Sequence, residues 1–151
     1  METQDDLLQP TLGRRDSPAT SIYSAQTGYI AAFFGGPLAG ATIALINAQR
    51  LNRLAVDWPL GLVAAALTVL PMWWWSRDGG LWAVAHFGAG VHELLFRALG
   101  LGFFALVYGC HRQYYRNMAL FGLAAPSGWA LGVVAVIGGL AVNFSLRLAF
   151  S

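Results

Sequence analysis

An uncharged stretch near the N-terminus most constrains what this chain can fold into. Residues 27–47 read Thr-Gly-Tyr-Ile-Ala-Ala-Phe-Phe-Gly-Gly-Pro-Leu-Ala-Gly-Ala-Thr-Ile-Ala-Leu-Ile-Asn, with no charged side chain over 21 positions. As one helix this stretch would be about 31 Å long, enough to cross the hydrocarbon core of a bilayer. We therefore predict that it crosses a membrane.

One face of that expected helix carries only small residues, spaced four apart, and ends in an amide. These helix-packing residues are Ala32, Gly36, Gly40, Ala44 and Asn47. In lipid, a stripe of small side chains lets another helix approach closely. Pro37, at the midpoint, removes a backbone hydrogen bond, so we expect a fixed kink there. The segment is predicted to be the central packing surface of the protein.

The composition agrees with a membrane protein. Of 151 residues, 57% are hydrophobic and only 11% are charged, whereas a soluble domain carries roughly 25% charged residues. Six of the sixteen charges fall in the first twenty residues, so the rest of the chain could not cover a soluble surface. The scattered arginines leave no nucleic-acid footprint. A single cysteine, Cys110, can form neither an intramolecular disulfide nor a cysteine-based metal site.

The pattern predicts an all-α membrane protein with four transmembrane helices in two hairpins. A flexible polar tail, 1–22, precedes a transmembrane domain, 23–151, whose expected spans are 27–47, 58–75, 91–110 and 128–146. Tryptophans at both ends of the second span fit an aromatic belt. Gly88 and Gly90 are expected to separate a short interfacial helix, 81–87, from the third span. Four spans would put both termini on one side.

The third and fourth expected spans carry small stripes of their own. Ala98 and Gly102 begin the stripe on the third span, which continues through Ala105 and Gly109. The stripe on the fourth span contains Gly128, Gly132, Ala135 and Gly139, and leads to Asn143. We interpret these residues as helix-packing positions, with Asn47 and Asn143 as side chains able to hydrogen-bond across helices and set their register.

Two ionisable residues fall inside the third expected span. Glu93 and Arg97 are four apart with Glu first, the favourable order for a helical ion pair. An ionisable residue at that depth is a functional candidate. The alternative is structural, because the pair neutralises itself and an arginine can reach the headgroups. We favour the structural interpretation and keep the pair as a candidate intramembrane site.

The closest approach to a metal cluster is His86, His92 and Glu93. A helical zinc motif needs ligands one turn apart, whereas His92 and Glu93 are adjacent and point about 100° apart on a helix. We interpret the three as interfacial polar residues rather than metal ligands, and expect no cofactor. No nucleophile–base motif and no glycine-rich phosphate loop is readable, so we expect a protein that is not an enzyme.

A run of residues around the first expected span resembles a group of small uncharacterised bacterial inner-membrane proteins. The run is Tyr23-Ser24, then Phe-Phe-Gly-Gly-Pro-Leu-Ala-Gly over 33–40, then Asn47. Proteins of that group open with Tyr-Ser, continue with Phe-Leu-Gly-(Gly or Ser)-Pro-Leu-Ala-Gly, and carry an Asn and basic residues just beyond. Phe34 here replaces the Leu. The resemblance covers about thirty residues and implies a multi-pass protein of the bacterial inner membrane, with no activity to carry over.

The function expected from the sequence is association of helices within the lipid bilayer, either as a homo-oligomer or with a larger membrane-protein partner. One alternative is a small transporter or channel subunit whose path is lined by Pro37, Glu93 and Arg97. A weaker alternative is a metal-dependent membrane hydrolase that uses His92 and Glu93.

Basic residues near a membrane decide orientation, and acidic ones contribute little. Four arginines lie in the two connections that follow the first and third expected spans: Arg50, Arg53, Arg112 and Arg116. We therefore expect these connections to be cytoplasmic. With four spans, both termini would then be periplasmic.

Overall fold

The computed structural model describes residues 22–88, 90–120 and 125–150, and over these ranges it contains helices and no strands. In chain order these are α1 (Ala25–Arg50), α2 (Leu54–Asp57), α3 (Pro59–Trp74), a π-helical turn η2 (Trp75–Gly79), α4 (Gly80–Phe87), α5 (Val91–Leu120) and α6 (Trp129–Phe150). The predicted tail, 1–22, falls outside the described residues except for Ile22.

Four helical stretches of the described chain are long and apolar enough to cross a bilayer. They are Ala25–Arg50, Leu54–Arg77, Val91–Asn117 and Trp129–Leu146. The expectation of an all-α, multi-pass membrane protein is confirmed at this level. Over its apolar window α1 is 56% buried within the protein, against 33% or less for the other three. The first helix is therefore the centre of the bundle, and the others cover it.

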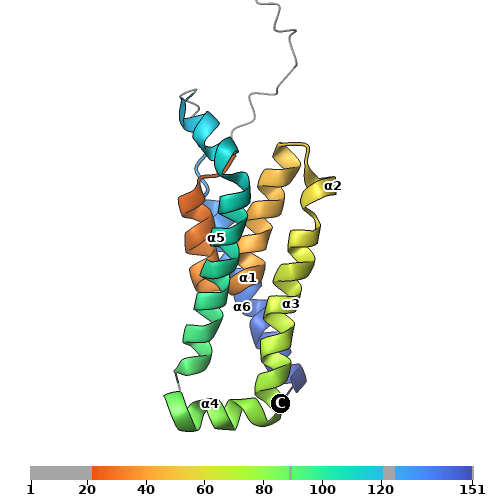
Figure 1. Ribbon diagram of the computed structural model, residues 1–151, viewed down its shortest axis with the longest axis vertical. Helices are drawn as coiled ribbons and strands as arrows, with labels where there is room; N and C mark the ends of the chain where they lie inside the picture. Colours follow the sequence, from red (N-terminus) through yellow and green to blue (C-terminus); the bar gives the residue numbers. More distant parts are fainter. Residues whose placement is uncertain (1–21, 89, 121–124, 151) are drawn as a thin grey trace, which may run out of the picture.

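The path of α1 differs from the straight span that its length and composition predict. At ~1.5 Å per residue, Tyr23 and Asn47 would lie about 36 Å apart on one helix. Instead the Tyr23 backbone N–H donates to Asn47 Oδ1 over 2.8 Å, and Asn47 Nδ2 donates to the Tyr23 carbonyl over 3.2 Å. Figure 1 shows α1 descending from the upper end and then returning to it. Residues 25–50 form a helical hairpin that enters and leaves at the same end.

The turn of this hairpin lies at Gly36. Its backbone is at φ 74° and ψ −166°, outside the helical region, with helix on either side. Glycine is the residue that adopts a positive φ without steric cost. Pro37 follows directly and begins the second arm, a position where its missing N–H costs nothing and its fixed φ suits a helix. The predicted kink is therefore a full reversal, because Gly36 breaks the helix before Pro37 restarts it.

The small residues of α1 let the two arms lie close together. A Cβ atom placed on Gly40 would lie 3.0 Å from the Ala32 Cβ, although the two residues are eight apart in sequence. The ring of Phe104, from α5, is fully buried against this hairpin. A Cβ on Gly28 would lie 1.8 Å from that ring. Part of the stripe expected to receive another helix therefore serves the packing of α1 on itself.

The other long helices pack around the hairpin. Its second arm packs with α3 and α5 through a buried cluster of Ala41, Ala44, Ala64, Phe103 and Val107. Both arms meet α6 in a second cluster of Ala31, Ala39, Ile43 and Ala135. Both α5 and α6 pack mainly on α1 and share almost no packing with each other. This leaves the space between α5 and α6 open wherever the hairpin does not reach.

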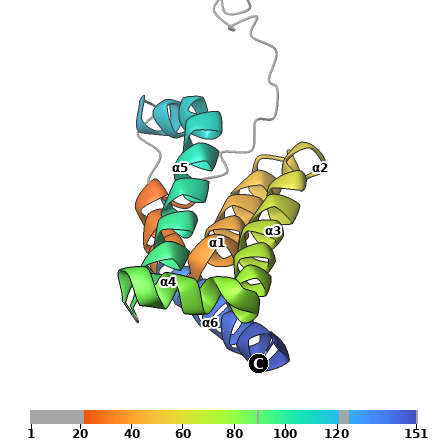
Figure 2. The ribbon, with the colours of Figure 1, turned by 60° about the horizontal axis from the view of Figure 1, so that its bottom comes forward.

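The short helix α4 lies across the lower end of the bundle, between α3 and α5 (Figures 1 and 2). The chain leaves the helical region at Arg77 (ψ −132°) before α4, and Gly88 (φ 89°) ends α4 before α5 begins at Val91. The interruption therefore falls where the glycines predict it. Trp58 and Trp73, near opposite ends of α3, are both exposed, as an aromatic belt requires.

The hairpin changes the predicted topology. Since α1 returns to its starting end, α3 descends, α5 ascends and α6 descends, and the C-terminal end of α6 lies at the lower end of the bundle (Figure 1). Ile22 and Phe150 therefore lie at opposite ends. The expectation of two transmembrane hairpins with both termini on one side does not hold, because Gly36 turns a span-length segment back on itself.

Candidate functional site

The tip of the α1 hairpin is wedged between the backbones of α5 and α6. A Cβ atom on Gly100 would lie 2.3 Å from the Ala32 carbonyl oxygen, and one on Gly139 would lie 2.2 Å from the Gly35 carbonyl oxygen. Glycine at both positions therefore permits backbone-to-backbone contact. Gly139 is ten residues from the start and eleven from the end of α6, so the tip lies near the mid-height of the bundle.

A helix end at that depth has few hydrogen-bond partners available for its free backbone N–H and C=O groups. Non-helical backbone in the hydrocarbon region is tolerated only where protein buries it or where it lines a polar cavity. Both conditions meet at this tip. Gly35, Gly36 and Pro37 are all buried, and a cavity lies directly beside them.

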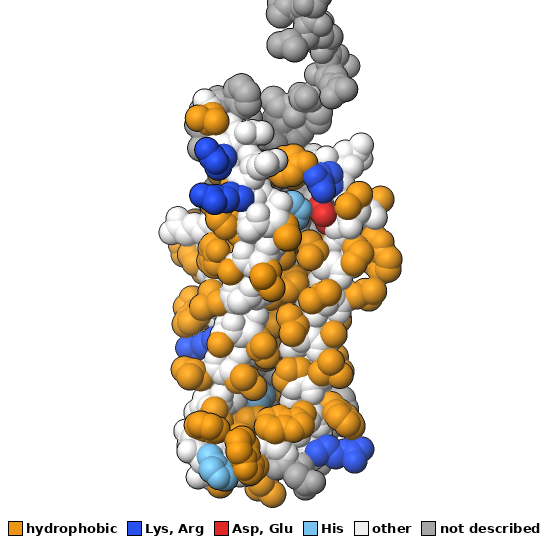
Figure 3. Space-filling view, in the orientation of Figure 1, with side chains coloured by type: hydrophobic (Ala, Val, Ile, Leu, Met, Phe, Trp, Pro, Cys, Tyr) orange, Lys and Arg blue, Asp and Glu red, His pale blue; other side chains and the backbone are white. Residues whose placement is uncertain are grey.

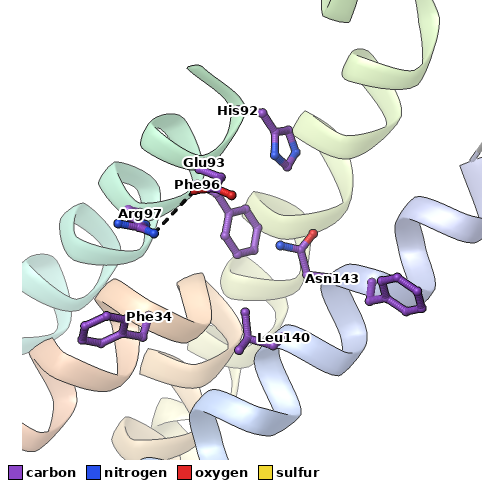
Figure 4. A pocket seen from close by; sticks show the side chains of 8 residues that line it. Phe34, His92, Glu93, Phe96, Arg97, Leu140 and Asn143 are labelled. Atoms are coloured by element: carbon purple, nitrogen blue, oxygen red, sulfur yellow. Dashed lines mark ion pairs between the residues drawn. The ribbon is translucent and has the colours of Figure 1, made fainter. Parts of the chain in front are cut away.

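That cavity has a volume of about 350 Å³ and lies between α5 and α6, beside the hairpin tip. Its lining consists of Phe34, His92, Glu93, Phe96, Arg97, Leu140, Asn143 and Phe144. Phe96 connects cavity and tip, because a Cβ on Gly36 would lie 2.0 Å from its ring. Figure 4 shows Phe96 and Asn143 projecting toward each other from facing helices. We call this space the sub-tip cavity.

The predicted ion pair is part of the sub-tip cavity. Arg97 Nη2 lies 3.5 Å from Glu93 Oε2, with 44% and 69% of the respective side chains exposed (Figure 4). The Arg97 guanidinium also lies over the ring of Phe33, 5.1 Å from its centroid. Because much of both side chains remains exposed, either charge can contact a further group in the cavity.

Asn143 supplies the other polar group of the sub-tip cavity. Its Oδ1 atom is buried and has no hydrogen-bond partner among the described residues. A buried amide oxygen without a donor costs free energy that a bound donor would recover. The two asparagines therefore differ, since Asn143 lines a cavity while Asn47 holds the hairpin mouth at the opposite end.

The mouth of the hairpin is closed by a network centred on Asn47. Besides its two bonds to Tyr23, Asn47 Nδ2 donates to the Tyr115 hydroxyl on α5 over 3.2 Å. Arg50 donates to the Tyr23 hydroxyl over 3.0 Å. Ser24 caps the first arm by accepting from the Thr27 N–H. The Tyr-Ser and Asn elements of the sequence pattern are thus the two sides of one clamp.

A second buried polar cluster lies at the same upper end, and sequence reasoning missed it. His111 Nε2 on α5 lies 3.1 Å from Asp57 Oδ2 on α2, and both residues are buried. Arg53 Nε lies 3.7 Å from the same carboxylate oxygen, and Arg53 donates to the Tyr114 hydroxyl. Asp57 and His111 are 54 apart in sequence, and the only signal for their pairing was that each lies just outside an expected span, 58–75 and 91–110 respectively.

The three candidate metal ligands do not form one cluster, although His92 and Glu93 both line the sub-tip cavity. His86 hydrogen-bonds through Nδ1 to the Trp82 carbonyl and stacks on that indole ring. The ring of His92 packs edge-on against Trp75, with 4.8 Å between centroids. Within the described residues no group of three His, Cys, Asp or Glu side chains is placed to hold a metal ion.

The stripes on α5 and α6 face different surroundings. On α6, Gly132 lies beside Thr27 of the first arm and Gly139 beside the tip, so that stripe packs on α1. On α5, the stripe residues Ala98, Gly102, Ala105 and Gly109 are all exposed. A Cβ on Gly102 or Gly109 would meet nothing within 4 Å. The α5 stripe therefore faces outward.

Comparison with protein-family models, with curated proteins and with solved structures finds no match for this chain.

Proposed function

We propose that this protein is a small transporter or channel subunit of the bacterial inner membrane, whose ligand enters the sub-tip cavity. The observation that carries the proposal is the re-entrant hairpin, which ends at mid-height beside a cavity lined with charged and polar groups. In many transporters, broken or re-entrant helices present their ends to a substrate near the bilayer midplane. The bacterial membrane is inferred from the sequence resemblance.

The closed upper end supports a cavity that is entered from below. Above the tip, Phe104 and the Asn47 network fill the interior between the hairpin and α5. Below the tip, the sub-tip cavity separates α5 from α6. A ligand would therefore enter from the end where α4 and the C-terminal end of α6 lie.

Cysteine accessibility tests this route. Cys110 is the only cysteine, so Cys110→Ser provides a cysteine-free background. We expect Asn143→Cys to react with a membrane-impermeant maleimide added at the C-terminal side. The matched control, Val134→Cys, lies on the same helix with 66% of the residue exposed on its outer face, and lipid should protect it.

Proteoliposomes provide the functional readout. They would be loaded with a panel of small ions and zwitterionic osmolytes, and the release of each would be compared with release from empty liposomes. We expect at least one solute to be released, and Arg97→Gln to alter that release. The proposal would be refuted if no solute of the panel is released faster than from empty liposomes and Asn143→Cys does not react with the maleimide.

The exposed stripe on α5 favours association as a second function. Glycine and alanine at spacings of four and three on an outward face are the pattern by which membrane helices approach one another. Gly102→Leu would block that approach without a clash inside the subunit, since the space around Gly102 is open. We expect the wild type to be oligomeric in nanodiscs and the variant monomeric. Monomers in both cases would exclude this interface.

The topology also changes the proposed orientation. Arg50, Arg53, Arg112 and Arg116 lie at the upper end, where Figure 3 shows most of the basic side chains on that face. Arg14 and Arg15 precede Ile22 by eight and seven residues, too few to recross a bilayer, so we count both on the side of Ile22. Arg77, Arg97 and Arg147 lie toward the lower end. Six arginines against three favours a cytoplasmic upper end.

We therefore propose a cytoplasmic N-terminus and a periplasmic C-terminus, in place of two periplasmic termini. Alkaline phosphatase is active only outside the cytoplasm, so it should be active when fused after Ser151 and inactive when fused before Met1. Fusions of green fluorescent protein at the same two positions should give the reverse pattern. Equal behaviour at the two ends would contradict both the orientation and the odd number of crossings.

A further inference from the structure

The sub-tip cavity opens sideways between two helices. Because α5 and α6 pack on α1 and hardly on each other, little covers the space between them below the tip. Three lining residues mark the opening on the outer surface: Phe34 is 55% exposed and Phe144 64% exposed, and the Glu93 side chain is 69% exposed. When the apolar helices span a bilayer this surface faces lipid, so a membrane component can enter laterally.

From the hairpin tip the cavity extends down to the start of α5, and its lower end lies at headgroup depth. Glu93 is two residues from the start of α5, at the end of the bundle that α4 crosses. Trp73 and Trp74, both exposed, lie at the same end of α3. Tryptophan side chains concentrate at the level of lipid headgroups. A charged ligand that enters from the side at this depth is most simply a lipid headgroup.

The charge arrangement selects among headgroups. Glu93 and Arg97 present opposite charges 3.5 Å apart, and each retains a large exposed fraction. A purely anionic ligand at Arg97 would meet the carboxylate of Glu93, and a purely cationic ligand at Glu93 would meet the guanidinium. A group that carries a phosphate next to an ammonium satisfies both side chains. Asn143 Oδ1, buried without a partner, can accept an additional N–H.

We propose that the sub-tip cavity binds the headgroup of a zwitterionic phospholipid of the leaflet on the α4 side, with the ammonium at Glu93 and the phosphate at Arg97. The apolar part of such a lipid would lie along the outer surface beside Phe144. The inference rests on the proposed function, since it names the ligand class of that cavity. Binding and solute release are separate measurements, so one proposal can fail without the other.

The test is native mass spectrometry of the full-length protein in mild detergent. The two probe lipids are phosphatidylethanolamine and phosphatidylglycerol with identical chains, supplied at equal concentration. We expect phosphatidylethanolamine to be retained preferentially. A hydrogen bond to a charged group contributes about 1.5–3 kcal/mol, so Glu93→Gln and Arg97→Gln should each lower its retention by about tenfold or more.

Arg77→Gln is the matched control, because Arg77 lies at the same end of the bundle and contacts Trp73 outside the cavity. It should leave the preference unchanged. Thermal unfolding of each variant, followed by circular dichroism, separates lost binding from lost folding. The proposal is overturned by equal retention of the two lipids, or by a preference that survives in both folded cavity variants. Retention of soluble phosphoethanolamine in place of the lipid, with both supplied at equal concentration, would also overturn it, in favour of a free solute.

Discussion

Replacing Asn47 with alanine should open the mouth of the hairpin. Asn47 is 4% exposed, and its side chain makes three hydrogen bonds: two with the backbone of Tyr23 and one with the Tyr115 hydroxyl. Hydrogen bonds between membrane helices average about 0.6 kcal/mol, which gives about 2 kcal/mol for three. The substitution also leaves the Tyr23 N–H without its acceptor, which can add about 1–3 kcal/mol.

We therefore expect Asn47→Ala to lower the free energy of unfolding by about 2–5 kcal/mol. Asn143→Ala is the matched control, because it removes the same amide where Oδ1 has no partner. Its cost should stay below about 1 kcal/mol. Both values come from reversible unfolding in mixed micelles at increasing SDS content, followed by tryptophan fluorescence.

The comparison between the two asparagines decides the argument. If Asn47→Ala and Asn143→Ala cost the same, the clamp at the hairpin mouth contributes nothing beyond an ordinary buried amide. If only Asn47→Ala is costly, the Tyr-Ser and Asn elements of the sequence pattern act together as one structural unit.

Two further predictions test the hairpin itself. Spin labels at Gln26 and Gln49, both exposed, should lie far closer together than the ~35 Å expected for a continuous helix. Double electron–electron resonance in nanodiscs measures this distance, and a value near ~35 Å would contradict the hairpin. Gly36→Ala should be destabilised by at least ~1–2 kcal/mol, because alanine disfavours a positive φ and its Cβ would collide with Phe96. Gly138→Ala, in open space on α6, should be neutral or slightly stabilised, and an equal loss in both would contradict the role of the turn.

Several features of the fold were predictable because they depend on local chemistry. The shortage of charge required a membrane, and four apolar segments of sufficient length follow directly from the sequence. The helix between Gly80 and Phe87 ends where Gly88 was expected to break it. The ion pair between Glu93 and Arg97 forms because a spacing of four places the two side chains on one helix face.

The topology depended on one residue, and local sequence does not determine how far the chain bends there. Gly36 next to Pro37 is compatible with a modest kink as well as with a reversal. The reversal is favoured by contacts that appear only after folding: Ala32 meets Gly40, and Asn47 reaches the backbone of Tyr23. A small-residue stripe has the same spacing whether its partner is another helix or the other arm of a hairpin.

The sequence by itself determined that the chain is helical, membrane-embedded and built around residues 27–47, because composition and length suffice for those conclusions. Only the tertiary structure decided that this segment turns back, that the two ends of the bundle differ, and that Glu93 and Arg97 share a cavity with Asn143 from another helix. The physical reason is that pairings such as Asp57 with His111 join residues 54 positions apart. Local periodicity carries no information about contacts at that separation.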